Sequence, residues 1–149
     1  LAKAVMCKQF SDAHTSTFAQ ATAAQYLQGG RLAAALARVR VVYAERAQAL
    51  GAALRSELGA AIDFVQPQGG LFIWARLTGA GGACADGQAL AQRAVQQGVA
   101  FVPGRPFYAC DPDWATLRLS FATVDAERIR EGVARLARAL KAGWEAGRK

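Results

Sequence analysis

The chain has 149 residues, and 53% of them are hydrophobic, which is enough for one good hydrophobic core. Its formal net charge of +7 would suit a nucleic-acid partner, but the arginines are spread over several predicted helices and form no cluster. No apolar run has the length of a membrane span, and residues 1–16 lack a signal-peptide pattern, so we expect a cytoplasmic protein without a membrane anchor.

The N-terminal part is predicted to be helical. Residues 15–28 are small and apolar, with Thr15 or Ser16 as N-cap and two glycines at the end. A second, long helix is predicted from Leu32 to about Leu58, roughly 40 Å long at 1.5 Å per residue. Its apolar residues recur at steps of three, four and seven: Leu32, Leu36, Val39, Tyr43, Leu50, Leu54 and Leu58. A helix of this length suits a connector between two lobes.

Strand patterns begin only after residue 60. We predict strands over 61–65, 71–77, 99–102 and 116–121, and helices over 87–97 and from Asp125 onward. Asp86 is the expected N-cap of the first of these helices and Gly98 its end. Residues 78–87 read as a loop, and they lack the pattern of a phosphate-binding loop. The order of these elements predicts an α+β fold in which helices cover one side of a small sheet.

No complete catalytic or metal-binding set is visible in the residues. Cys7, Cys84 and Cys110 are odd in number and lack CxxC spacing, so we expect reduced thiols and neither disulfides nor a zinc site. His14 lies at a helix start, where a capping or surface role is favoured. The stretch CDPDW at 110–114 is typical of a turn.

One arginine stands out in the stretch TLRLSF, residues 116–121. Its apolar residues alternate on one face of the predicted strand, and Arg118 lies on the other. A guanidinium presents a planar fork of donors that matches a carboxylate. The predicted turns at 69–70 and 103–104 would bring the aromatic residues Phe72, Phe107 and Tyr108 around it. An arginine at a sheet edge, a structural ion pair and a clamp for a ligand anion remain open.

Five stretches, in this order, resemble the C-terminal part of the fold-type I, pyridoxal-phosphate-dependent aminotransferases. They are KQFSDAHTSTFAQ, RVRVVYAERAQAL, PQGGLFIWARL, GVAFVPGRPFY and TLRLSFATVDAERIREGVARLARAL. The match covers essentially the whole chain. It is most similar to the group that contains the α-aminoadipate and kynurenine aminotransferases and the aminotransferase-like domains of GntR/MocR regulators.

This resemblance implies roles for particular residues. Arg118 would hold the α-carboxylate of the substrate, Phe72 and Phe107 would line the substrate pocket, and Gly70 would allow close approach. Residues 1–30 would be the C-terminal remnant of a large domain, 31–58 the connecting helix and 59–149 the small domain. The α+β lobe would then belong to a larger α/β architecture whose cofactor-binding domain is mostly absent from this chain.

The resemblance also implies what the chain lacks. In the family, the Schiff-base lysine lies in a Ser-x-x-Lys stretch followed by Pro-Gly-x-Arg-x-Gly, and the other cofactor contacts also lie upstream. Lys3 and Lys8 do not match this motif, because the segment around them resembles the one that follows it. We therefore expect no catalytic and no cofactor-binding residue in this chain, and pyridoxal phosphate only in the full-length protein.

The leading hypothesis is the C-terminal portion of a homodimeric aminotransferase that moves an amino group from an amino acid to a 2-oxo acid. The alternative within the same fold is the effector-sensing domain of a GntR/MocR-type transcription regulator. A third hypothesis is a basic nucleic-acid-binding module with Phe72 and Trp74 as stacking residues on one strand face. The scattered charges and the absence of an RNP1-type pattern count against it, so no nucleic-acid partner is expected for this chain.

Overall fold

The computed structural model describes residues 1–78 and 86–146 and divides the chain into two compact units between Arg40 and Val41. The first unit contains α1 (Ala2–Asp12), α2 (Thr17–Gln28) and the beginning of α3 (Arg31–Leu58). The predicted N-cap of α2 is confirmed, because the Ser16 side chain accepts a hydrogen bond from the Ala19 N–H. Helix α1 was not predicted. It has no side-chain cap and no buried residue, so neither a capping motif nor an apolar face indicated it.

The long helix predicted from Leu32 to about Leu58 is present as α3, which begins one residue earlier, at Arg31. Its C-terminal half belongs to the second unit, where Leu50, Leu54 and Leu58 are buried in the hydrophobic core. Leu32 and Leu36, from the same apolar stripe, are exposed in the first unit. No helix within residues 1–78 and 86–146 combines the length and the apolar character that crossing a membrane requires.

The second unit is built around a four-stranded antiparallel sheet with the strand order β1-β2-β4-β3. The strands are β1 (Ile62–Phe64), β2 (Phe72–Leu77), β3 (Val102–Pro103) and β4 (Thr116–Ser120). In the register of the sheet, Arg118 on β4 is the partner of Trp74 on β2 and of Val102 on β3. Arg118 therefore lies on an inner strand, with a neighbour on each side.

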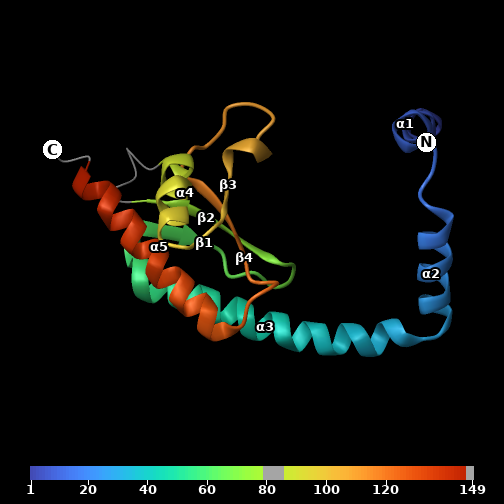
Figure 1. Cartoon of the computed structure of the whole chain (residues 1–149), viewed down its shortest axis with the longest axis horizontal. Helices are drawn as coiled ribbons and strands as arrows, with labels where there is room; N and C mark the ends of the chain where they lie inside the picture. The colour runs from blue at the N-terminus through green and yellow to red at the C-terminus, as the bar shows by residue number, and fades with distance from the viewer. Residues whose placement is uncertain (79–85, 147–149) are drawn as a thin grey trace. The chain divides into compact units, whose positions relative to one another are not determined.

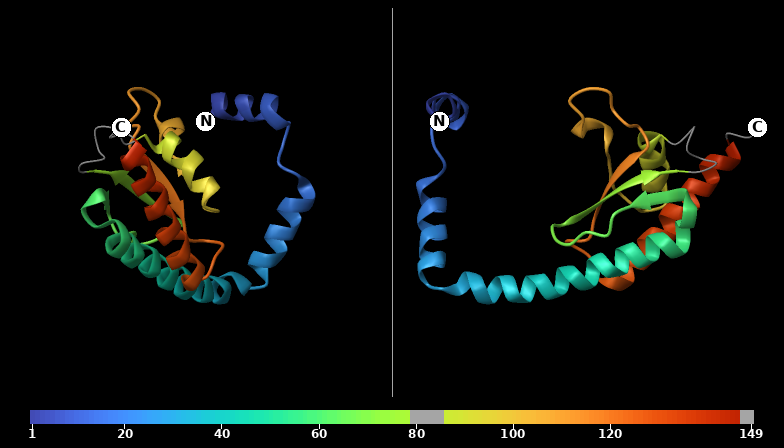
Figure 2. Two further views of the ribbon diagram at one scale, coloured as in Figure 1. Left: turned by 60° about the vertical axis from the view of Figure 1, so that its left-hand side comes forward. Right: turned by 180° about the vertical axis from the view of Figure 1, so that it is seen from behind.

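Helices cover one face of this sheet, which confirms the predicted α+β fold. The residues of β2 and β4 that face the core, such as Ile73 and Leu117, are buried with residues of α3, α4 (Gly87–Gln96) and α5 (Ala126–Ala146). Figures 1 and 2 show these three helices next to the sheet. The other face carries Phe72, Trp74 and Arg118. Because side chains alternate along a strand, the apolar residues of β2 and β4 determine which residues point away from the core.

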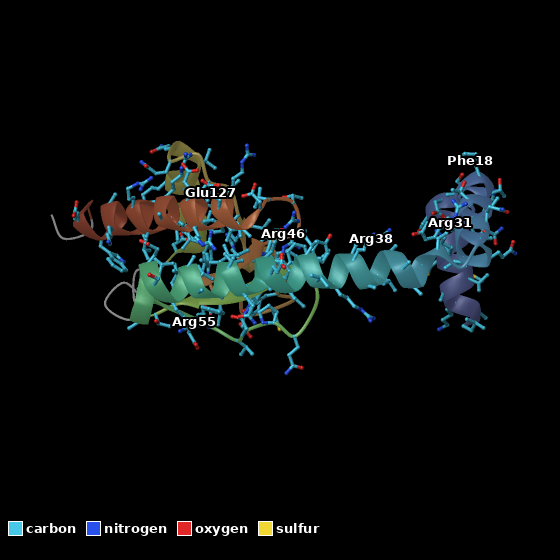
Figure 3. All side chains as sticks on the ribbon, turned by 90° about the horizontal axis from the view of Figure 1, so that it is seen from below. Phe18, Arg31, Arg38, Arg46, Arg55 and Glu127 are labelled. Atoms are coloured by element: carbon cyan, nitrogen blue, oxygen red, sulfur yellow. The ribbon has the colours of Figure 1, made fainter. Side chains whose placement is uncertain are left out.

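Helix α5 runs alongside the C-terminal half of α3, with side chains filling the space between them (Figure 3). Arg46 of α3 donates a hydrogen bond of 2.5 Å to the backbone carbonyl of Ala122, between β4 and α5. The start of α5 is capped by Asp125, whose side chain accepts from the Arg128 N–H at 2.9 Å, as the predicted helix start implies. These contacts connect the end of β4 to the helical layer.

Helix α4 and β3 show where the sequence predicted well and where it did not. Asp86 caps α4 by accepting from the Gln88 N–H, and Gly98 follows the helix with a positive φ of 73°. The strand predicted over residues 99–102 is displaced to Val102–Pro103, because only these two residues pair with β4. Pro103 is tolerated there because β3 is an edge strand. Cys84 and most of the glycine-rich stretch 78–87 lie outside the described residues.

Candidate functional site

Arg118 projects from the sheet face that the helices leave uncovered, and two aromatic rings lie against its guanidinium. Its Cζ atom is 4.4 Å from the ring centroid of Phe72 and 4.7 Å from that of Phe107. Both distances are in the range of cation–π attraction, which is stronger where water is partly excluded. The structure thus brings together Arg118, Phe72 and Phe107, three of the four predicted site residues.

The Arg118 guanidinium has an N–H donor without an acceptor among the described residues. Its Nε atom is buried and has no hydrogen-bond partner, and none of the ion pairs within residues 1–78 and 86–146 includes Arg118. A buried N–H without a partner is unfavourable by about 1–3 kcal/mol. Because β4 is also an inner strand, a sheet-edge arginine and a structural ion pair both fit the described residues less well than an anion clamp.

Phe107 reaches Arg118 because Gly104 packs tightly on β4. The Gly104 N–H donates to the Thr116 carbonyl at 2.7 Å, and a Cβ on Gly104 would lie only 2.1 Å from the Thr116 Oγ1. Any larger residue would therefore push the segment away from β4. The short helix η3 (Arg105–Phe107) follows directly, so this close approach sets the position of Phe107.

A second layer of aromatic contacts involves Trp74. Its ring is perpendicular to that of Phe107, with the centroids 5.7 Å apart at an interplanar angle of 83°, and lies 6.2 Å from that of Tyr108. The sequence placed Trp74 on the same face as Phe72 but did not connect it to Arg118. The alternation along β2 indicates the face on which Trp74 lies. It identifies Arg118 as the partner of Trp74 only once the register between β2 and β4 is known.

Gly70 lies in the turn that precedes β2, with a positive φ of 80°, a conformation that favours glycine. Among residues 1–78 and 86–146, apart from its two chain neighbours, none has an atom within 4 Å of the position that a Cβ on Gly70 would occupy, so its identity follows from backbone conformation. Close approach of a substrate at Gly70 remains a prediction.

The turn before β4 is organised by Asp113, which confirms the predicted turn around CDPDW. Its Oδ2 atom accepts from the Arg76 Nε at 2.6 Å, and its Oδ1 atom accepts from the Ala115 N–H at 2.9 Å. The bond from Arg76, followed by the bond from Ala115, holds the pKa of the Asp113 carboxyl below its ordinary value. This carboxylate therefore stabilises the entry into β4.

The substitution Asp113→Asn keeps the acceptor for the Ala115 N–H but removes the charge. Because the pKa of Asp113 is lowered in the folded state, its contribution to stability is present above the ordinary aspartate value of about 3.9 and is lost as the pH falls through the folded-state value. Since the side chains of Arg76 and Asp113 are 55% and 32% exposed, water screens the pair, and we expect the melting temperature of the variant to be lower by only a few degrees at pH 7.

Thermal unfolding of both proteins between pH 7 and pH 2 checks this expectation, and the difference should shrink toward the acid end. Asp111→Asn, the same change two residues earlier, is the control. The melting temperature of this variant should depend on pH in the same way as that of the wild-type protein. A difference that stays constant with pH would show that the charge of Asp113 is not its cause.

The described residues contain neither a metal site nor a lysine suited to form a Schiff base. Within residues 1–78 and 86–146, no three His, Cys, Asp or Glu side chains converge on a metal site. The described lysines Lys3, Lys8 and Lys141 are exposed on helices, and Lys8 pairs with Asp12. They do not have the buried environment that is typical of a lysine that forms a Schiff base.

Comparison with known proteins relates this chain to a family. A family model described as aminotransferase class I and II matches residues 3–136. The chain is 45% identical over 141 residues to the 2-aminoadipate transaminase of Thermus thermophilus, and 36% identical over 139 residues to the aromatic-amino-acid aminotransferase 1 of Thermococcus litoralis. These matches cover 95% and 93% of this chain but 34% and 32% of the relatives, so the chain spans about a third of their length.

Solved structures give the same result. The chain is similar to the α-aminoadipate aminotransferase of Thermus thermophilus, complexed with N-(5'-phosphopyridoxyl)-L-leucine, with a TM-score of 0.80 and 42% identity. This match covers 92% of this chain and 34% of that one. The kynurenine aminotransferase of Pyrococcus horikoshii, in complex with PMP, matches with a TM-score of 0.80 and 36% identity, covering 93% of this chain and 33% of that one.

Proposed function

Since this chain belongs to the class I and II aminotransferase family, we propose that it forms the C-terminal part of a pyridoxal-phosphate-dependent aminotransferase. The complete enzyme would move an amino group from an amino acid to a 2-oxo acid. The family resemblance inferred from the sequence motifs is confirmed. The proposal for the complete enzyme is supported by relatives named as transaminases and by homologous structures that hold pyridoxal-derived groups.

Within that enzyme, Arg118 is the proposed clamp for the α-carboxylate of the substrate. The observation that carries this role is the buried Nε without a partner, on a guanidinium held against Phe72 and Phe107. Two parallel N–H···O bonds to a carboxylate would use these donors and fix the orientation of the substrate. The rings of Phe72 and Phe107 would line the pocket and exclude water. The test is Arg118→Lys in the complete enzyme.

The residues that the structure describes do not fit the role of holding the cofactor. Lys3, Lys8 and Lys141 are exposed on helices, and the described residues contain no buried amine near Arg118. We therefore assign the cofactor to residues outside this chain and derive no step through it. The contribution of the chain would be substrate orientation.

The 149-residue chain alone should show no transaminase activity and should not form a specific cofactor adduct, because a suitable lysine is missing. The measurement is borohydride reduction with one equivalent of pyridoxal phosphate, followed by peptide mass analysis, beside an assay with an amino acid and a 2-oxo acid. A stoichiometric adduct on Lys3, Lys8 or Lys141 would contradict the assignment of the cofactor to another part of the protein.

The proposal includes the domain organisation inferred from the resemblance: 1–30 as a remnant of the large domain, 31–58 as the connecting helix and 59–149 as the small domain. Helix α3 passes from the first compact unit into the second, which supports its role as a connector.

Exposed apolar residues within 15–58, including Phe18 and Leu36, support the proposed homodimer. A cytoplasmic location is proposed as well.

A further inference from the structure

We infer that Trp74 is a positioning residue that holds the ring of Phe107 against Arg118 and thereby fixes the plane of the guanidinium. This inference rests on the proposed role of Arg118 as the carboxylate clamp. It assigns to Trp74 a function that depends on Arg118 and does not require Trp74 to touch the substrate.

The two rings at the guanidinium have unequal support from the backbone. Phe72 begins β2 and pairs in register with Ser120 of the inner strand β4. Phe107 is the last residue of the three-residue helix η3 and is 51% exposed. The Phe107 N–H bonds to the Gly104 carbonyl at 3.0 Å, which positions the backbone but leaves both side-chain torsions free. The orientation of the Phe107 ring must therefore come from side-chain contacts.

Trp74 supplies such a contact from a rigid mount. It is the register partner of Arg118 on β2, and its ring meets that of Phe107 at 83°, a favourable edge-to-face arrangement. The same indole also contacts Tyr108, so it connects the strand to two consecutive residues of the loop. Trp74 and Arg118 thus reach the same Phe107 ring, which couples the indole to the guanidinium.

Trp74 is not part of the hydrophobic core, so its proposed role can be tested without disturbing the core. Its side chain is 41% exposed and lies on the sheet face opposite the helices. Replacing it with leucine leaves the core intact but removes the edge-to-face contact. The ring of Phe107 then gains freedom, the guanidinium plane loses one of its two supports, and the bound carboxylate is held at a less defined angle. A loss of orientation lowers turnover more than affinity.

A double-mutant cycle in the complete enzyme tests the inference. Trp74→Leu, Arg118→Lys and the double variant are compared by kcat and KM for the amino acid at saturating 2-oxo acid. We expect Trp74→Leu to lower kcat/KM by about threefold to tenfold, mainly through kcat. The double variant should be no worse than Arg118→Lys alone, because Trp74 acts through Arg118. Trp74→Phe, which keeps an aromatic edge, should recover most of the loss.

Trp144→Leu is the matched control, because Trp144 lies on α5 and packs against the core on the other side of the sheet. It should leave kcat and KM near the wild-type values. If Arg118→Lys has no effect, the proposed clamp itself is wrong. If Arg118→Lys impairs the enzyme but Trp74→Leu is silent, additive with it, or matched by Trp144→Leu, the clamp stands and the role of Trp74 is overturned.

Discussion

Replacing Arg118 with lysine in the complete enzyme should lower kcat/KM for amino acids by about tenfold to somewhat over a hundredfold. Lysine keeps the positive charge but loses the second parallel hydrogen bond and the planar contacts with Phe72 and Phe107. A charge-assisted hydrogen bond contributes about 1.5–3 kcal/mol, which corresponds to this range. Since the clamp also orients the substrate, part of the loss should appear in kcat.

Arg76→Lys is the matched control for this experiment. Arg76 lies on the same face of the sheet, two residues after Trp74, but its partner is Asp113, and lysine can keep that ion pair. It should leave the amino-acid kinetics close to those of wild type. Cofactor occupancy, followed by absorbance, should be unchanged in both variants. Unchanged kinetics for Arg118→Lys, or loss of the cofactor from it, would mean that the carboxylate is held elsewhere.

Truncating Phe121 should have the largest effect on stability. Phe121 is only 1% exposed, follows β4 directly and packs edge-on against Tyr43 of α3, with the ring centroids 6.3 Å apart. Phe121→Ala removes this contact and leaves a cavity between sheet and helix, which should lower the free energy of unfolding by about 3–5 kcal/mol. Denaturant unfolding followed by circular dichroism measures the change.

Phe72→Ala is the same chemical change on the opposite face of the sheet. Because Phe72 is 40% exposed, its truncation should destabilise the protein clearly less than that of Phe121. The kinetic effects should be reversed, with Phe72→Ala impairing the use of amino acids in the complete enzyme. Equal losses of stability in the two variants would contradict the assignment of Phe121 to the core and Phe72 to the site.

Much of the fold was readable from local patterns. The caps Ser16, Asp86 and Asp125 begin helices where the sequence placed them, because a side-chain acceptor for free N–H groups is a local device. The alternation in residues 71–77 and 116–121 identified two strands within one residue at each end, since a period of two needs no knowledge of the partner. The motif LRLSF likewise singled out Arg118 and its orientation away from the core.

Pairing between distant segments was not readable in the same way. The run VAFV at 99–102 has strand composition, yet only Val102 and Pro103 form β3, because a strand exists where a partner backbone lies alongside it. Helix α1 carries no cap and no buried face that its sequence could have revealed. The position of β3 depends on pairing with β4, a strand further along the chain. Helix α1 has no buried residue, so it has no apolar face that a local pattern could reveal.

For the site, too, the sequence predicted the local features and the tertiary structure determined the contacts between segments. The alternation of side chains was enough to predict that Arg118 lies on a rigid strand and that Phe72 and Trp74 share a face of another. It could not predict that these two strands are neighbours, that their register sets Trp74 opposite Arg118, or that Gly104 brings Phe107 onto the same guanidinium. The folded chain establishes all three, because register and close approach depend on contacts between segments far apart in the sequence, and no local pattern encodes such contacts.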